Sequence, residues 1–228
     1  MAFPETRWSI VRRAAGKPSV ETQAALEELC GAWSEPVFAF VRRRVSSREQ
    51  AEDITQDFFA HIISGQLLSR ASEETGRFRS FLLHALRCFL ADQHDFYQAK
   101  KRGGGRIIIP IDTAELQPMQ GVTPETEFDR RWVRSLLRRC LDQLAGEYAG
   151  SRRKLFEVLS DQLDAPEQRG TKQIAHELGM TDGAVRVALH RMKMRLGELI
   201  RREIADTLPP GASIDDELGQ LKRILENS

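Results

Sequence analysis

Apolar residues recur at spacings of three and four along most of the chain, which is the period of one face of an α-helix. In residues 22–45 this face consists of Leu26, Leu29, Cys30, Trp33, Val37, Phe40 and Val41. Pro36 lies within the stretch. Because proline lacks a backbone donor and clashes with the preceding turn, we expect two helices here, with Ser34 as the cap between them.

Two more helices are expected before residue 103. Ser47 and Gln50 resemble a capping box and predict a helix over 48–63, whose inner face holds Ala51, Ile54, Phe58 and Ile62. A polar loop over 64–76 follows. The next stripe at helical spacing predicts a helix that ends in the basic segment 98–102; it comprises Phe78, Leu82, Ala85, Leu86, Phe89, Gln93 and Phe96.

Glycines 103–105 stop that helix, and the stretch to 126 contains three prolines and little helical period. We interpret 103–126 as a flexible linker. A phosphate-binding loop is not favoured, because no Gly-Lys-Ser/Thr follows the glycines and no strand precedes them.

A second helical unit starts at Glu127, with apolar positions Trp132, Leu136, Leu137, Cys140, Leu141 and Leu144. A helix over 155–163 and two closely spaced helices from Thr171 to about Ile204 follow. At 228 residues, the chain exceeds the usual single core of about 100 to 150 residues. We therefore expect an all-α fold of two small helical domains, 1–102 and 127–205, joined by the linker and followed by a C-terminal extension, 206–228.

The segment 171–199 predicts a helix-turn-helix. Ile174, Ala175 and Leu178 form the inner face of a first helix, Gly179 supplies the turn, and Thr181 caps the second helix. The inner face of the second helix holds Val185, Ala188, Leu189 and Met192. Its outer face and basic flanks, which suit base edges and phosphates of a major groove, hold Asp182, Gly183, Arg186, Val187, His190, Arg191, Lys193 and Arg195. A plain helical hairpin is the alternative.

Charge is segregated, although the net charge is only +1. Basic residues predominate within 70–106 and 130–154, and acidic residues predominate after 204, as in a protein that contacts both nucleic acid and protein. No run approaches the roughly 18 apolar residues of a membrane span, so we expect a cytoplasmic protein without membrane contact. The three separated cysteines, Cys30, Cys88 and Cys140, favour buried thiols over a metal or redox site.

Three blocks in order resemble sigma factors, the promoter-recognition subunits of bacterial RNA polymerase. I-A-H-E-L-G-M-T-D-G-A-V-R-V-A-L-H-R at 174–191 resembles region 4, and A-E-D-I-T-Q-D-F-F at 51–59 resembles region 2.2. G-R-F-R-S-F-L-L-H-A-L-R-C-F-L-A-D at 76–92 resembles regions 2.3 and 2.4. The lack of room for regions 1.1 and 3 is typical of the extracytoplasmic-function group. The resemblance implies a non-enzymatic protein without cofactor or metal, which binds core RNA polymerase, recognises the minus-35 and minus-ten promoter elements and promotes DNA melting. It also allows for an anti-sigma factor or another regulator as a partner.

The resemblance assigns residues to three surfaces. Core polymerase would dock on Glu52, Asp53, Gln56 and Asp57; a solvated acidic face is the alternative. At the minus-ten element, unstacked bases would be captured by Arg77, Phe78, Arg79 and Ser80, with aromatic and guanidinium groups stacking on them. Phosphates would be contacted by Arg87, His94, Lys100, Lys101 and Arg102. Phe78 and Phe81 could instead be core, and core is favoured for Phe81. The minus-35 element would meet Thr181, Asp182, Arg186, Val187, His190, Arg191, Lys193 and Arg195.

Two positions depart from the family pattern. Cys88 stands where many relatives have Asn, and Val187 and Ala188 stand where Ser and Arg are common. These departures leave the promoter sequence open.

Two other functions fit parts of the sequence. A metalloenzyme could use His84, Asp92, His94 and Asp95, but adjacent residues such as His94 and Asp95 diverge by about 100° on a helix, which disfavours it. A transcriptional regulator could use the helix-turn-helix without docking on polymerase, which would leave the blocks at 51–59 and 76–92 unexplained.

The extension also predicts structure. Pro209, Pro210 and Gly211 end the preceding helix, and Ser213 with Asp216 can cap a new one. Its apolar stripe, Leu218, Leu221, Ile224 and Leu225, needs a surface to pack on, because a short single helix is marginal in water. We expect it to dock on the domains and bias them between closed and open arrangements; a purely structural clasp is the alternative.

Overall fold

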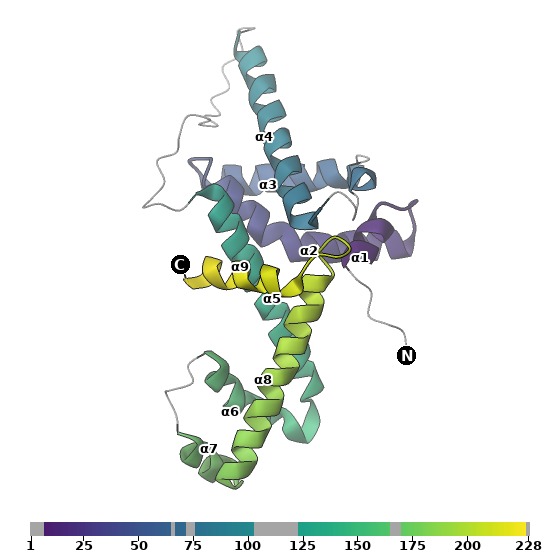
Figure 1. Ribbon diagram of the computed structural model, residues 1–228. Helices are drawn as coiled ribbons and strands as arrows, with labels where there is room; N and C mark the ends of the chain where they lie inside the picture. The colour runs from purple at the N-terminus through teal and green to yellow at the C-terminus, as the bar shows by residue number, and fades with distance from the viewer. Residues whose placement is uncertain (1–6, 65–66, 72–75, 103–122, 165–169, 227–228) are drawn as a thin grey trace. The chain divides into compact units, whose positions relative to one another are not determined.

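The computed structural model describes residues 7–64, 67–71, 76–102, 123–164 and 170–226. These residues form helices and short 3-10 turns without any strand, which confirms the all-α expectation (Figure 1). The α-helices are α1 (Arg7–Ala14), α2 (Val20–Arg42), α3 (Arg48–Ser64), α4 (Phe78–Arg102), α5 (Pro124–Glu147), α6 (Arg153–Asp164), α7 (Thr171–Leu178), α8 (Asp182–Ala205) and α9 (Ile214–Glu226). The 3-10 turns are η1 (Leu68–Arg70) and η4 (Gly150–Arg152).

Helix α2 continues through Pro36, so the expected break capped by Ser34 is wrong. Proline cannot donate to the carbonyl of Ala32, four residues earlier. That carbonyl instead accepts a hydrogen bond from the Ser135 hydroxyl of α5, at 3.5 Å. Pro36 is buried, so its ring also contributes to the core. The actual cap of α2 is Ser19, whose Oγ accepts from the Thr22 backbone N–H at 3.1 Å.

Other helix starts follow the expected capping chemistry. The Ser47 hydroxyl accepts from the Gln50 N–H at 3.0 Å before α3, and the Ser213 hydroxyl accepts from the Asp216 N–H at 3.2 Å before α9. Helix α5 begins at Pro124, three residues before the start expected at Glu127, so residues 124–126 of the expected linker are helical. Proline suits the first turn of a helix, and the Thr123 hydroxyl caps it by accepting from the Thr126 N–H at 3.1 Å. Most of the expected linker, 103–122, lies outside the described residues.

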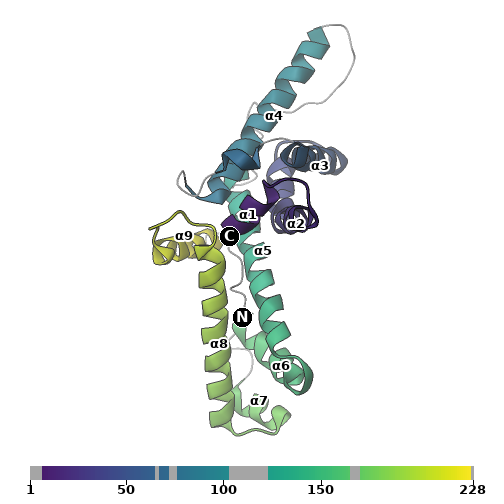
Figure 2. The same cartoon turned by 90° about the vertical axis from the view of Figure 1, so that its right-hand side faces the viewer.

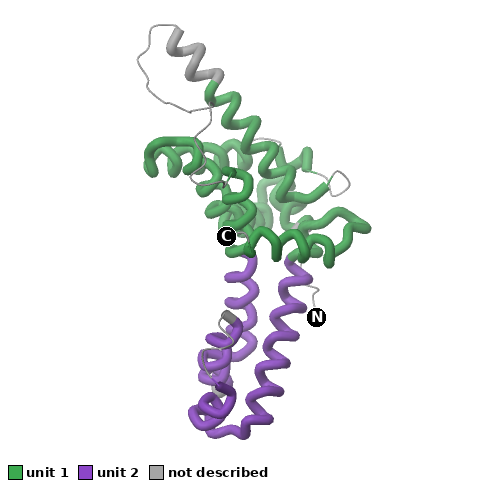
Figure 3. The backbone as a smooth tube through the Cα atoms, turned by 60° about the vertical axis from the view of Figure 1, so that its left-hand side comes forward, with its two compact units in different colours: residues 1–135, 204–228 green, residues 136–203 purple. Residues whose placement is uncertain are grey.

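The chain divides into two compact units, 1–135 with 204–228, and 136–203 (Figure 3). These bounds differ from the sequence-based domain bounds at 127 and 206. The difference arises because the first half of α5 contributes Phe128 and Trp132 to the core of the first unit. The extension after Ile204 belongs to that unit as well.

The first unit is built around an aromatic cluster. Trp33 of α2 stacks on Trp132 of α5, with ring centroids 5.9 Å apart, and meets the edge of Phe78 of α4 at 5.5 Å. Trp8 of α1 contacts Phe78 at 5.7 Å. All four rings are at most 3% exposed, and each buried ring stabilises the fold by about 1.5–3 kcal/mol. Helix α1, which the sequence analysis did not single out, thus belongs to the core.

The second unit packs α6, α7 and α8 with the second half of α5 (Figure 2). Its buried apolar residues are Leu136, Cys140, Leu144, Val158, Leu159, Ile174, Ala175, Val185, Met192 and Leu199. Of the inner face expected for α8, Val185 and Met192 are fully buried, whereas Ala188 and Leu189 are half-buried. The core of this unit therefore fixes which face of α8 remains exposed.

Candidate nucleic-acid and polymerase interfaces

Helices α7 and α8 form a helix-turn-helix. Gly179 adopts the left-handed conformation, with φ of 63°, which glycine tolerates without a Cβ clash. The Met180 N–H donates to the carbonyl of Ala175 at 2.9 Å, closing the end of α7. Thr181 then caps α8 by accepting from the Ala184 N–H at 3.2 Å. The turn forms at the residues expected from the sequence.

The outer face of α8 is open to solvent. In its first half, Gly183, Arg186, Val187, His190, Arg191 and Lys193 are exposed and Asp182 is partly exposed; Thr181, the cap before the helix, is exposed as well. Val187 is 50% exposed, which is high for an apolar side chain and matches a position that could contact a thymine methyl group. The structure therefore brings seven of the eight residues assigned to the minus-35 element, all except Arg195, onto the open side of α8 and its cap.

Asp182 holds Arg186 at the start of this face. Its carboxylate accepts hydrogen bonds from the Thr171 hydroxyl of α7 and from the Arg186 guanidinium one turn later in α8. These hydrogen bonds, that of Thr171 foremost, lower the pKa of Asp182 below its ordinary value. The carboxylate is thus ionised at neutral pH and restrains the guanidinium that is expected to read a base.

Arg195, the eighth residue, has a different environment. Its guanidinium donates to Glu147 of α5, with Nη2 to Oε1 at 2.7 Å and Nε to Oε2 at 2.9 Å, and to Glu198 at 2.8 Å. The hydrogen bond from Arg195 lowers the pKa of Glu147. Arg195 therefore joins α8 to α5, and its donors are engaged by carboxylates where a phosphate contact was expected.

The four residues assigned to polymerase docking share one exposed stripe of α3. Glu52, Asp53, Gln56 and Asp57 are all exposed, and Ile54, Phe58 and Ile62 on the opposite side are buried. Glu52 accepts from Arg48 at 2.7 Å, an exposed pair that contributes little to stability. Asp53 and Asp57 present their carboxylates outward beside it.

The start of α4 departs from the expected base-capturing loop. Phe78 is 1% exposed and lies in the aromatic cluster, so in this conformation its ring is core and cannot stack on a base. Arg79 is 8% exposed, with its guanidinium 4.7 Å from the centre of the Trp132 ring. Ser80 is exposed and Arg77 is half-buried. Phe81, for which a core position was favoured, is also half-buried.

Two arginines near the start of α4 pair with carboxylates. Arg79 is 3.1 Å from Glu217 of α9 and 3.4 Å from Asp129 of α5. Arg77 is 3.0 Å from Glu217. Burial raises the pKa of Asp129, although the charge of Arg79 opposes the shift. Four charged groups thus converge where the sequence suggested only a basic loop.

Farther along α4, Arg87 donates to Glu125 of α5 at 2.8 Å, and Arg44 donates to the same oxygen at 3.1 Å. Burial acts to raise the pKa of Glu125, but the hydrogen bond and charge of Arg87, with the charge of Arg44, lower it overall. Arg87 is therefore paired, while half of its side chain stays exposed. His94 is half-buried; the side chains of Lys100, Lys101 and Arg102 lie outside the described residues.

No group of three or more His, Cys, Asp or Glu side chains could hold a metal ion in the part of the chain that the structure describes. The Nε2 of His84 lies 3.6 Å from the sulfur of Cys88. Cys140 is buried, Cys30 is half-buried, and Cys88 is exposed, so the expectation of a buried thiol is wrong for Cys88. Burial raises the pKa of Cys30.

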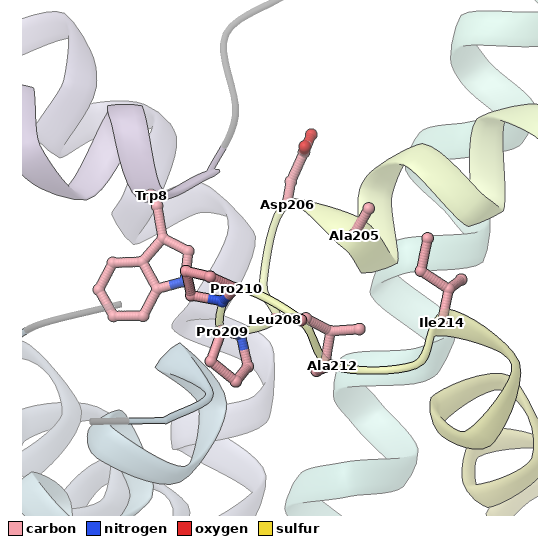
Figure 4. Close-up of a pocket in the computed structure, with 9 residues that line it drawn as sticks. Trp8, Ala205, Asp206, Leu208, Pro209, Pro210, Ala212 and Ile214 are labelled. Carbon is pink, nitrogen blue, oxygen red and sulfur yellow. The ribbon is translucent and has the colours of Figure 1, made fainter. Parts of the chain in front are cut away.

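A pocket of about 270 Å³ lies where the chain passes from α8 to α9 (Figure 4). Trp8, Pro209, Pro210 and Ile214 line it with their neighbours along the connection. Gly211 takes a φ of 81°, which allows the reversal after the two prolines. The pocket therefore lies between Trp8 of α1 and the connection that leads into α9.

Sequence reasoning missed several residues around the start of α4. Glu217, Asp129 and Trp132 surround Arg79, and Glu125 engages Arg87. Acids near a helix start give little signal in the sequence, because they suit the positive end of any helix. A signal was present in Glu217, which lies at a spacing of four from Leu221 and so shares its inner face.

No family model matches this chain, and no curated protein or solved structure matches it either. Among the described residues, no helix combines the length and the apolar character needed to cross a lipid bilayer.

Proposed function

We propose that this chain is a sigma factor of the extracytoplasmic-function type, which binds core RNA polymerase, recognises promoter elements and promotes DNA melting. The observation that carries the proposal is the helix-turn-helix of α7 and α8, whose open face combines Arg186, His190 and Lys193. Guanidinium groups of such a helix can donate two hydrogen bonds to a guanine edge, and flanking lysines contact phosphates.

The stripe on α3 supports the polymerase-binding part of the proposal. Exposed carboxylates of Asp53 and Asp57 beside the amide of Gln56 suit a basic protein surface, where opposite potentials speed association. The resemblance assigns this stripe to the clamp coiled coil of the largest catalytic polymerase subunit. The protein would then recruit polymerase and would not itself catalyse a reaction.

A second function is favoured by one observation. Phe78 and Arg79 are both buried and Phe81 is half-buried, so the start of α4 does not present a fully exposed aromatic group for capturing melted bases. A helix-turn-helix regulator that never melts DNA would have no need of such a group. The two functions differ in whether the chain binds polymerase.

Binding to core polymerase separates the two functions. Purified bacterial core enzyme is titrated with fluorescently labelled protein, and binding is followed by anisotropy in the absence of DNA. A sigma factor forms a saturable complex that a known sigma factor displaces. A regulator that acts without polymerase binds promoter DNA and shows no saturable binding to the core enzyme.

A further inference from the structure

Helix α9 covers the start of α4 through one buried carboxylate. Glu217 is 1% exposed, and its two oxygens divide between two arginines, with Oε2 3.0 Å from Arg77 and Oε1 3.1 Å from Arg79. Gln220, one turn later in α9, accepts from Arg77 at 2.9 Å. Both arginines are among the residues that the resemblance assigned to the minus-ten element.

Burying a carboxylate is unfavourable unless charged partners compensate for the lost hydration. Arg77 and Arg79 supply that compensation, so Glu217 determines where α9 docks. The rest of the contact is modest, since Leu221 is buried while Leu218, Ile224 and Leu225 keep part of their surface exposed. A helix of 13 residues is marginal when detached, and so its docking can be reversed by a competing ligand.

The competing ligand must resemble the group that it replaces. Two guanidinium groups around one carboxylate form an anion site, and the same fork geometry binds phosphate oxygens. A detached α9 would leave Arg77 and Arg79 without the Glu217 charge. Asp129 and Trp132 would stay beside Arg79, because both belong to α5. Phe78 would also stay in its cluster with Trp8 and Trp33.

We propose that α9 is an intramolecular competitor of single-stranded DNA, in which the Glu217 carboxylate occupies an anion site that a backbone phosphate occupies once α9 detaches. This inference deepens the proposed function, on which it rests for the identity of the ligand. It assigns the extension an autoinhibitory role at a defined contact. The site is formed by Arg77 and Arg79, and the occupant is set by their shared preference for an anion.

The expected effect follows from population arithmetic. If only the α9-detached state binds single-stranded DNA, the apparent affinity is the intrinsic affinity reduced by the detached fraction. A helix docked in nine molecules of ten therefore weakens binding about tenfold. Any change that detaches α9 should tighten the binding of single-stranded DNA by the same factor.

The test compares Glu217→Ala with Asp216→Ala in the full chain. Asp216 is exposed on the same helix, so its variant loses the same charge without disturbing the contact. Binding of a fluorescein-labelled single-stranded oligonucleotide is measured by anisotropy. Glu217→Ala should tighten binding about tenfold, Asp216→Ala should change it little, and adding Arg77→Ala to Glu217→Ala should remove the gain.

A second variant keeps the test independent of Glu217. Leu221→Asp removes the buried apolar anchor and leaves Glu217 in place. The added negative charge by itself weakens DNA binding, so tighter binding by Leu221→Asp would reflect detachment of α9. In the wild-type chain, saturating oligonucleotide should also accelerate amide hydrogen exchange in 214–226.

Three results would overturn the inference: equal affinities of Glu217→Ala and the wild type, an equal gain in Asp216→Ala, or unchanged α9 exchange when the oligonucleotide is bound. None of these readouts involves polymerase. The competition can therefore fail while the chain still supports transcription, and failure of the chain to bind core polymerase would refute the proposed function without touching the competition.

Discussion

Glu147 of α5 accepts two parallel hydrogen bonds from Arg195 of α8, at 2.7 Å and 2.9 Å. A bidentate pair of this kind is stronger than an ordinary surface ion pair. We therefore expect Arg195→Ala to destabilise the second unit by about 1 kcal/mol. Its effect on duplex DNA binding should be small. Lys193→Ala, the control, should leave stability unchanged and reduce the salt dependence of binding by about one phosphate contact.

Thermal unfolding and salt titrations of DNA binding measure both effects. If Arg195→Ala lowers the salt dependence as much as Lys193→Ala does, Arg195 contacts phosphate and the structural role is wrong.

The contribution of the Arg195–Glu147 pair to stability should also depend on pH. Since the pKa of Glu147 is lowered in the folded state, its contribution is present above the unfolded pKa of about 4.3 and is lost as the pH falls through the folded value. The difference in free energy of unfolding between Glu147→Gln and the wild type should vanish once the pH is below the folded-state pKa of Glu147.

Arg186→Ala should relax sequence preference at one position of the bound DNA. Removal of a bidentate base contact costs about 1–3 kcal/mol on the preferred sequence and little on others. The measurement compares transcription from promoters with intact and with scrambled upstream elements. Equal losses on both would rule out base reading by Arg186. Asp182→Asn, which weakens the restraint on Arg186, should reduce the preference less than Arg186→Ala does.

Charge reversal at Asp53 and Asp57 should abolish binding to core polymerase. Both side chains are exposed on α3, so Arg at either position leaves the core of the first unit intact and helix content unchanged by circular dichroism. Glu28→Arg, at an exposed position of α2, serves as the control for the change in net charge. Unaltered core binding by the Asp53 and Asp57 variants would exclude this stripe as the docking surface.

Local sequence chemistry predicted the helix-turn-helix because each determinant is close in sequence. Gly179, Thr181 and the inner-face residue Val185 act within a few residues of one another. The pairing of Arg79 with Glu217 could not be predicted in the same way. It depends on how α4, α5 and α9 pack, and each charge alone is typical of an exposed helix. Phe78 was ambiguous for a related reason, since an aromatic group at a helix start suits both a core and a base-stacking role.

The wrong prediction at Pro36 leads to its own test. The break was expected because proline leaves a carbonyl unpaired, but the Ser135 hydroxyl binds that carbonyl on Ala32. Ser135→Ala should destabilise the chain by about 1 kcal/mol. In the background of Pro36→Ala the same substitution should cost less, because residue 36 then donates its own N–H to Ala32. A double-mutant cycle in urea measures the coupling; purely additive effects would mean that the Ser135 hydroxyl does not serve this carbonyl.

Initiation of transcription tests the central claim most directly. Bacterial core polymerase, which starts poorly at specific sites alone, is combined with the purified chain and fragments of host genomic DNA, and transcript 5′ ends are mapped. We predict discrete start sites that appear only with the chain, share upstream sequence elements and disappear with the Asp53 and Asp57 charge reversals. Start sites that are the same with and without the chain, at protein concentrations that saturate DNA binding, would contradict a sigma factor.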